Sequence, residues 1–232
     1  MKSKILISTG GSGGHVIPAI TMHDHLKENY DILISSDVRG LKYLDDKFYN
    51  TLIIDTPKLN NFILLPLSIL KVFFLTLRSL ILLKKEEIQI LISTGGYMSL
   101  PLCIAARILN IKIYLLEPNM VIGRANKFFL KFCKKIICYS ETIIGFPKKY
   151  KYKLKITNPL IRKKYYNKNL KENNEKFTLM IIGGSQGAQI FDKILHQSII
   201  KISKIKPLKV FHQTNQKNIG DLKNLYSENK ID

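Results

Sequence analysis

A repeated unit constrains the fold of this chain more than any other sequence feature: an apolar run, a turn, then a helical stretch. The first unit has the run Lys4–Ser8, glycines from Gly10 to Gly14, and a helix expected from about Pro18 to Asn29. Further runs of this kind are Asp31–Ser36, Thr51–Asp55, Ile88–Thr94, Ile111–Glu117 and Lys135–Ser140. Nearly continuous apolar strands alternating with helices are typical of a parallel sheet covered on both faces. The sequence therefore predicts an α/β fold.

A second domain is expected after a linker. The stretch Lys163–Lys176 is rich in Lys and Asn and has weak periodicity, which favours a linker between a domain at 1–162 and another at 177–232. The second domain is expected to contain the strands Phe177–Gly184 and Leu208–His212, with a helix between them from about Ala188 to Ser203. Two such units are fewer than a doubly wound domain needs, so we expect this domain to be incomplete.

Composition indicates a globular chain with an anionic partner. The chain carries 37 basic and 17 acidic residues, a formal net charge of +20, and 46% hydrophobic residues. That apolar fraction can bury a sizeable core, which excludes disorder as a description of the whole chain. The excess charge favours attraction to nucleic acid, a phosphorylated substrate or an acidic membrane surface.

The three cysteines predict a reducing compartment. Cys103, Cys133 and Cys138 are odd in number and form no CxxC pair, which argues against a disulfide framework and a zinc site. We expect them to be buried thiols. The apolar run after Lys4 is too short for the core of a secretory signal, so we expect a cytoplasmic protein.

The stretch Asn61–Leu83 is the most hydrophobic of the chain. A membrane span needs about 20 mostly apolar residues, and a central Lys or Arg costs roughly 2.5 to 3.5 kcal/mol. Lys71 and Arg78 lie seven residues apart and share one helix face. The alternatives are a span, a buried core helix and an interfacial helix, of which we predict the interfacial one. Its membrane-facing side chains would include Phe73, Phe74, Leu77 and Leu80.

The glycine cluster Gly10–Pro18 follows the first strand and is the first candidate binding loop. Glycines there let the backbone approach a ligand, and the following helix offers free N–H groups to a phosphate. A P-loop is excluded because no Lys-Ser or Lys-Thr pair follows, and the dinucleotide fingerprint fails at Val16, although Asp37 lies where a ribose-binding acid would be. His15 is the candidate general base.

Two further glycine clusters also follow predicted strands. Ser93–Pro101 contains Tyr97, and the next strand leads into Glu117, Asn119 and Asn126. Ligands of open α/β sheets bind at the carboxyl ends of strands, so we expect these side chains at one site. The third cluster carries Ser185 and Gln186, which suit a diphosphate or sugar hydroxyls.

Five short motifs, taken in order, resemble the MurG family of N-acetylglucosaminyltransferases. They are Gly10–Pro18, Gly95–Tyr97, Glu117–Asn119, Asn158–Pro159 and Gly183–Ala188. The resemblance implies a GT-B-like fold, with a complete N-terminal Rossmann-like domain and the first part of a second one in a C-terminally incomplete chain. It also implies the donor UDP-GlcNAc, the undecaprenyl-linked acceptor lipid I, and peripheral association with an anionic inner membrane at its cytoplasmic face. Nucleic acid is then not an expected partner.

The family's site residues carry over by position. Donor contacts would be Ser12, Gly13, Gly14, Asn119, Arg162, Ser185 and Gln186. His15 would lie at the reaction centre, with Glu117 as the next candidate base, and Tyr97 and Asn126 would line the acceptor cleft. No DxD pair appears, so the sequence requires no metal, and no cofactor is expected.

Two other functions stay open at this point. The chain could be a non-catalytic, membrane-docking half that binds the acceptor and needs a separate donor-binding chain, or an inactive fragment. A nucleotide-dependent oxidoreductase is disfavoured because the dinucleotide fingerprint fails.

Overall fold

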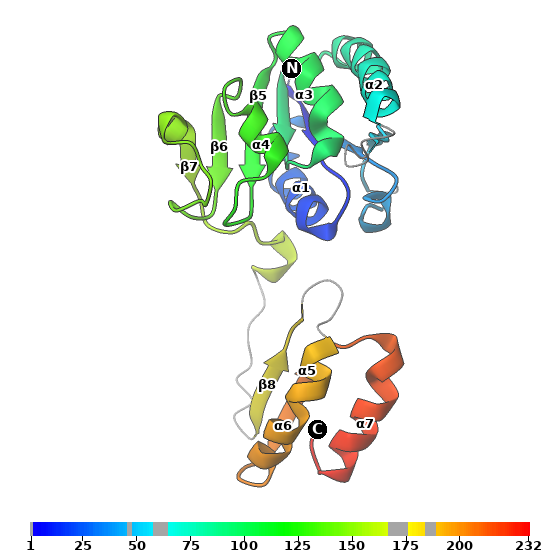
Figure 1. Ribbon diagram of the computed structural model, residues 1–232, viewed down its shortest axis with the longest axis vertical. Helices are drawn as coiled ribbons and strands as arrows, with labels where there is room; N and C mark the ends of the chain where they lie inside the picture. The colour runs from blue at the N-terminus through cyan, green and yellow to red at the C-terminus, as the bar shows by residue number, and fades with distance from the viewer. Residues whose placement is uncertain (1, 46–47, 58–64, 167–175, 184–188) are drawn as a thin grey trace. The chain divides into compact units, whose positions relative to one another are not determined.

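The computed structural model describes residues 2–45, 48–57, 65–166, 176–183 and 189–232. The chain divides into two compact units, Met1–Lys168 and Asn169–Asp232 (Figure 1). The division between them falls inside the stretch that we expected to be a linker, Lys163–Lys176.

Unit 1 is built on a parallel sheet. The described residues form seven strands in the order β3-β2-β1-β4-β5-β6-β7, and every neighbouring pair is parallel. The strands are β1 (Lys4–Ser8), β2 (Asp31–Ser36), β3 (Thr51–Ile53), β4 (Ile90–Ser93), β5 (Lys112–Glu117), β6 (Lys135–Cys138) and β7 (Leu154–Ile156). This confirms the predicted α/β class and the Rossmann-like N-terminal sheet. The seventh strand was not predicted, because β7 has only three residues with a lysine in the middle.

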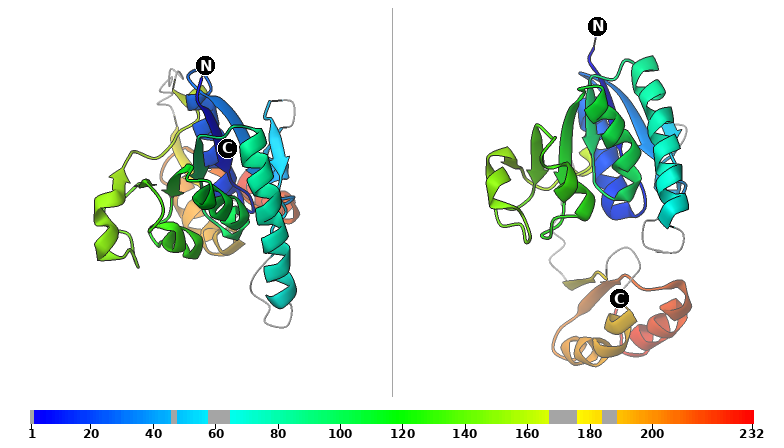
Figure 2. Two further views of the ribbon diagram at one scale, coloured as in Figure 1. Left: turned by 90° about the horizontal axis from the view of Figure 1, so that it is seen from above. Right: turned by 45° about the horizontal axis from the view of Figure 1, so that its top comes forward.

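Helices cover both faces of this sheet. They are α1 (Gly13–Leu26), α2 (Leu65–Lys85), α3 (Leu100–Ile108) and α4 (Arg124–Phe129). Strand β1 alternates between the two cores: Leu6 packs with residues of α2, α3 and α4, whereas Ile5 and Ile7 pack with Ala19 of α1. Helix α2 lies along α3 on the outside of the sheet (Figure 2).

The first helix begins earlier than predicted. Helix α1 starts at Gly13, with the extended residue Ser12 as its N-cap, so Pro18 lies inside it. A proline lacks the N–H that would bond the carbonyl four residues before, here that of Gly14, which is why we expected the helix to start at Pro18. The consequence is that His15 lies in the first turn of a helix rather than in a loop.

The thiols of the three cysteines are buried and free, as expected. Burial raises the pKa of Cys103 to about 12, and it raises that of Cys138 to about 12 as well. Thiols in that state are poor nucleophiles at neutral pH.

Helix α2 turns large apolar side chains outward. The residues that it buries are small or polar apart from one: Ser68, Thr76, Ser79 and Leu83. Phe73 is 56% exposed, Phe74 is 59% exposed, and Leu67, Ile69, Leu70, Leu77 and Ile81 are exposed too. The interpretation as a buried core helix is therefore wrong for the described part, Leu65–Lys85; Asn61 to Leu64 lie outside the described residues. Leu80 differs from the predicted membrane set, because it is half-buried against the core.

Among the described helices, α2 is the one that is long and apolar enough to cross a membrane by length and composition. A helix that packs on the sheet of a soluble protein can have the same length and apolar composition. Its hydroxyl groups bond within the helix: Thr76 donates to the Val72 carbonyl at 2.8 Å and Ser79 to the Leu75 carbonyl at 2.7 Å. The buried hydroxyls of Thr76 and Ser79 are thus satisfied within the helix. Leu75, Leu80, Leu82 and Leu83 pack against the core, whereas the other large apolar side chains named above lie on the outer face.

Unit 2 contains a small parallel sheet. Its elements are β8 (Phe177–Ile181), α5 (Gln189–Ile194), α6 (His196–Ser203), β9 (Leu208–His212) and α7 (Ile219–Glu228). One helix was predicted between the strands, but it is divided between α5 and α6 at Leu195. Ile181, Ile199, Leu208 and Leu222 form the buried centre.

Candidate functional site

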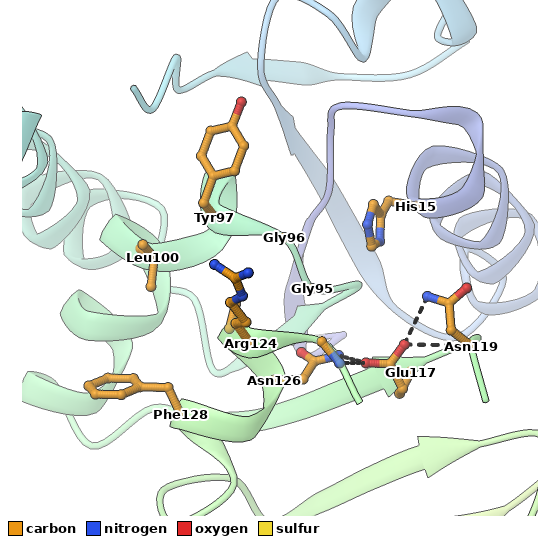
Figure 3. A pocket seen from close by; sticks show the side chains of 12 residues that line it. His15, Gly95, Gly96, Tyr97, Leu100, Glu117, Asn119, Arg124, Asn126 and Phe128 are labelled. Atoms are coloured by element: carbon orange, nitrogen blue, oxygen red, sulfur yellow. Dashed lines mark hydrogen bonds between the residues drawn. The ribbon is translucent and has the colours of Figure 1, made fainter. Parts of the chain in front are cut away.

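A cleft lies at the carboxyl ends of the strands of unit 1. Its volume is about 480 Å³. It is lined from three places: the first turn of α1, the loop after β4, and the segment from the end of β5 into α4 (Figure 3). Because the strands are parallel, their carboxyl ends meet at one edge, and this edge is where open α/β sheets bind ligands. The lining residues that the sequence had singled out are His15, Tyr97, Glu117, Asn119 and Asn126.

His15 is held by one hydrogen bond that defines its free nitrogen. Its Nδ1 lies 2.7 Å from the carbonyl oxygen of Thr94, the residue that follows β4. A carbonyl oxygen only accepts hydrogen bonds, so Nδ1 is assigned the proton and the neutral ring carries a lone pair on Nε2. A Cβ built on Gly96 would lie 3.9 Å from that Nε2. The basic nitrogen therefore sits beside the glycine loop that forms the cleft wall.

The loop after β4 requires its glycines. Gly95 and Gly96 have φ values of +87° and +81°. A Cβ on Gly96 would lie 2.2 Å from the sulfur of Met98, and one on Gly95 would lie 3.0 Å from the amide nitrogen of Asn126. Side chains at these two positions would distort the wall between His15 and the start of α4.

Glu117 organises the opposite wall. Its buried carboxylate accepts hydrogen bonds from the backbone N–H of Gly123 at 2.7 Å and of Asn119 at 3.2 Å. The side-chain amides of Asn119 and Asn126 donate to it as well, each at 3.0 Å. Four N–H donors occupy the carboxylate oxygens, so this group fixes the loop between β5 and α4. Such a carboxylate is poorly placed to receive a substrate proton.

Asn119 and Asn126 differ in exposure and in the polar atoms that they could offer to a ligand. The Nδ2 of Asn126 also donates to the carbonyl of Leu116 at 3.0 Å, and its Oδ1 is buried with no partner among the described residues. Asn119 is exposed at the cleft wall. In Figure 3 the phenol of Tyr97 points away from Glu117 and its amide partners.

Asp37 lies outside the cleft lining and holds the glycine turn after β1, a role that the sequence did not predict. Its buried carboxylate accepts the N–H groups of Gly11 at 2.7 Å and Gly40 at 3.0 Å, and it pairs with Arg39. Burial alone would raise the pKa of this carboxyl, but these hydrogen bonds outweigh it and hold the pKa below its ordinary value. Its oxygens are used by the turn, which leaves no free carboxylate for a ribose. The Arg39 guanidinium lies over the Tyr97 ring at 5.2 Å and links two loops.

The structure brings none of the remaining predicted donor residues that it describes into the lining of the cleft. Ser12 is the N-cap of α1, Gly13 and Gly14 open its first turn, and the hydroxyl of Ser12 caps nothing. Arg162 does not line the cleft; it lines a separate cavity of about 300 Å³ with Asp24 and Tyr49. Ser185 and Gln186 lie outside the described residues. No group of three or more metal-ligating side chains occurs in the described part of the chain.

Comparison with known proteins identifies the family to which this fold belongs. The model of the glycosyltransferase family 28 N-terminal domain matches residues 5–138. The chain is 49% identical over 233 residues, all of its length, to the UDP-N-acetylglucosamine--N-acetylmuramyl-(pentapeptide) pyrophosphoryl-undecaprenol N-acetylglucosamine transferase of Pelagibacter ubique. It is 31% identical over 96% of its length to the transferase of that name from Rickettsia canadensis. The chain spans 65% and 64% of these two relatives.

A solved structure supports the fold. The crystal structure of Acinetobacter baumannii MurG covers 100% of this chain, which matches 65% of that chain, with a TM-score of 0.72 and 22% identity. The chain therefore belongs to glycosyltransferase family 28. Within that family it is a member of the MurG group, as the resemblance in its loops had implied.

The buried carboxylate of Asp37 gives an acid-side test of the glycine turn. Because its folded pKa is depressed, its stabilising contribution is present above the unfolded value of about 3.9 and is lost as pH falls through the lower folded pKa. Asp37→Asn should be less stable than wild type at neutral pH, and the difference should shrink below about pH 4. Urea unfolding across this range measures it. With the exposed Asp31→Asn as control, a difference independent of pH would contradict this role for Asp37.

The four bonds to Glu117 predict a local effect on the cleft wall. In Glu117→Gln, an amide nitrogen would replace one of the accepting oxygens, and a buried donor left unpaired costs about 1 to 3 kcal/mol. We expect faster hydrogen exchange at the N–H of Gly123, with the sheet unchanged. The matched control is Glu141→Gln at an exposed position. Equal exchange at Gly123 in both variants would show that the carboxylate does not hold this loop.

Proposed function

We propose that the protein is an inverting glycosyltransferase that moves GlcNAc from UDP-GlcNAc to the C4 hydroxyl of the MurNAc unit of lipid I, giving lipid II for peptidoglycan synthesis. The names of the two relatives specify this sugar, this donor and this polyprenyl acceptor. One observation carries the proposal furthest: the hydrogen bond between His15 Nδ1 and the Thr94 carbonyl, which leaves Nε2 basic beside the cleft.

In the proposed step, Nε2 of His15 takes the proton of the acceptor hydroxyl as its oxygen attacks the anomeric carbon. The new C1–O bond forms on the face opposite the leaving group, which inverts the anomeric centre. The bond from C1 to the diphosphate oxygen breaks, and its electron pair leaves with UDP. The imidazolium that results is stabilised by the bond from Nδ1–H to the Thr94 carbonyl.

The donor diphosphate would lie at the start of α1. The first N–H groups of a helix have no partner inside the helix, and the helix dipole favours negative charge there. Gly13 and Gly14 provide those groups without side chains, and the hydroxyl of Ser12 adds a free donor. Asn119, Arg162, Ser185 and Gln186 are proposed as further donor contacts by family position.

The acceptor would approach from the wall formed by the loop after β4 and the start of α4. Tyr97 and Asn126 line that side, and the buried Oδ1 of Asn126 lacks a partner in the described residues. Glu117 is then a positioning residue, since its oxygens already hold Asn119, Gly123 and Asn126.

The outer face of α2 is proposed to rest on the cytoplasmic face of the inner membrane. Exposed Phe and Leu side chains contribute roughly 1.5 to 3 kcal/mol each when fully buried in an apolar phase. Lys71, Arg78, Lys84 and Lys85 on the same helix are exposed and suit an anionic bilayer. The proposal is peripheral docking rather than a span, because Lys71 and Arg78 lie within the apolar stretch.

Replacing the proposed base tests the mechanism. Loss of a general base costs about 10²- to 10⁴-fold in rate, so His15→Ala should lower kcat by that order and leave UDP-GlcNAc affinity nearly unchanged. Turnover is followed as transfer of labelled GlcNAc to lipid I, in a form extended to the relatives' length if the 232-residue chain has none. Ser185→Ala, in the proposed donor loop, should act mainly on KM. A near-normal kcat in His15→Ala would remove His15 from the mechanism.

The non-catalytic alternative has its own test. The chain spans 65% and 64% of the transferases from Pelagibacter ubique and Rickettsia canadensis, so a part of the relatives that has no counterpart here could supply donor contacts. Calorimetric titration with UDP-GlcNAc distinguishes the two functions: measurable binding supports the transferase, whereas its absence supports an acceptor-binding half that needs another chain.

Membrane docking is tested with two exposed aromatic residues. Phe73→Ser with Phe74→Ser should release a folded protein from vesicles of anionic phospholipid, and wild-type binding should weaken with salt. Phe48→Ser is the control, since this side chain is 73% exposed elsewhere in unit 1. Equal sedimentation of all variants with vesicles would contradict the docking face. Resistance of wild type to alkaline carbonate extraction would instead indicate a span.

A further inference from the structure

The amino edge of the unit 1 sheet gathers lysines from three neighbouring strands. Lys112 is the first residue of β5, Lys134 directly precedes β6, and Lys153 directly precedes β7. Strands β5, β6 and β7 are neighbours and parallel, so their first residues lie at one edge. Glu117 in the cleft lies at the other end of β5. The lysine-rich edge is therefore separate from the proposed transferase site.

These lysines line a cavity, which we call the amino-edge cavity. Its volume is about 430 Å³, and its cationic lining residues are Arg107, Lys112, Lys131, Lys134 and Lys153. Among the described residues that line it there is no Asp or Glu. Nor does any ion pair found within the described ranges involve one of these five cations. Five like charges around one hollow repel one another until an anion enters.

An aromatic ring holds two of these cations in place. The Lys131 ammonium lies 4.6 Å from the centre of the Phe132 ring, and the Arg107 guanidinium lies 5.1 Å from it. Cation–π contacts of this length fix charged groups that would otherwise move freely in solvent. The Arg107 guanidinium also donates to the Asn110 side-chain oxygen at 3.3 Å.

Lys153 is the buried member of the set. Its side chain is largely enclosed, and Nζ donates to the carbonyls of Leu130 at 2.7 Å and Lys131 at 3.0 Å, at the end of α4. Two carbonyls satisfy two of its three N–H groups but do not neutralise the charge. A buried cation without a carboxylate is costly, and a bound anion would lower that cost.

We propose that the amino-edge cavity binds a phosphate-bearing anion: a soluble diphosphate or the phosphodiester headgroup of an anionic lipid. Lysine ammonium groups and one guanidinium are the donors that proteins use for such oxyanions. The cavity is within the size range of small-ligand sites. This inference does not depend on the transferase proposal, because no cleft residue takes part in it.

Calorimetry with inorganic pyrophosphate tests the site directly. The cavity variant is Lys131→Glu with Lys134→Glu, both exposed, and the matched control is Lys148→Glu with Lys149→Glu, an equal charge change on exposed residues outside the cavity lining. The cavity variant should bind at least about tenfold more weakly than wild type, while the control stays within a few fold. NMR shifts caused by pyrophosphate should centre on the amides of Lys112, Lys134 and Lys153.

Vesicles distinguish the two sources of phosphate. Sedimentation with phosphatidylglycerol vesicles and with phosphatidylcholine vesicles is compared for both variants. A specific loss of phosphatidylglycerol binding in the cavity variant, competed by pyrophosphate, assigns a lipid headgroup. Pyrophosphate binding with equal vesicle binding in both variants assigns a soluble ligand. Weakening of pyrophosphate and phosphatidylglycerol binding to the same extent in both variants, or no binding of either probe, would overturn the proposal, because diffuse positive charge would then explain the attraction.

Discussion

The cleft depends on one constraint: a polar group buried at the carboxyl edge of the sheet is costly unless a hydrogen bond satisfies it, and most of those in the described residues have such a bond, with the Oδ1 of Asn126 as an exception. Three loops meet there, and their backbone N–H and C=O groups cannot be satisfied by strand pairing. Two buried carboxylates take up the N–H groups, Asp37 for the turn after β1 and Glu117 for the loop after β5. The imidazole of His15 takes up the carbonyl of Thr94 after β4. The shape of the site follows from these pairings.

The same hydrogen bonds distinguish the residues that position loops from the residue that is free to react with a substrate. Glu117 and Asp37 are acidic side chains in or near a cleft, yet N–H donors already surround their oxygens, so each acts on loops rather than on substrate. His15 differs because its protein partner engages only one ring nitrogen. The early start of α1 at Gly13 is what places it there, since a helical first turn directs the imidazole toward the β4 loop.

The strands were predictable because their runs are nearly continuously apolar and alternate with helical stretches, a pattern typical of a parallel sheet covered on both faces. Strand β7 could not be found that way: three residues with a central lysine resemble a loop until β6 is seen beside them. The start of α1 was missed because Pro18 is tolerated inside the helix. The exposed apolar face of α2 was predictable from charge spacing, but the packing of Leu80 against the core was not.

The sequence predicted which residues gather at the site, but it did not predict the hydrogen bonds that they form. Glycine loops after strands indicated that His15, Tyr97 and Glu117 share an edge, since carboxyl ends of parallel strands coincide. Which donors a carboxylate meets depends on the backbone path of the loops, so Asp37 was considered for ribose binding, whereas its oxygens hold the turn at Gly11.

The proposed chemistry requires that the Thr94 carbonyl fix His15 as the Nδ1–H tautomer and leave Nε2 free to accept a proton. Long-range nitrogen-15 NMR of the histidine rings measures this directly, because protonated and unprotonated ring nitrogens resonate far apart. The assignment of the His15 signal comes from its loss in His15→Gln. At a pH where the ring is neutral, we expect a protonated Nδ1 and an unprotonated Nε2. A neutral His15 ring with its proton on Nε2 would contradict it.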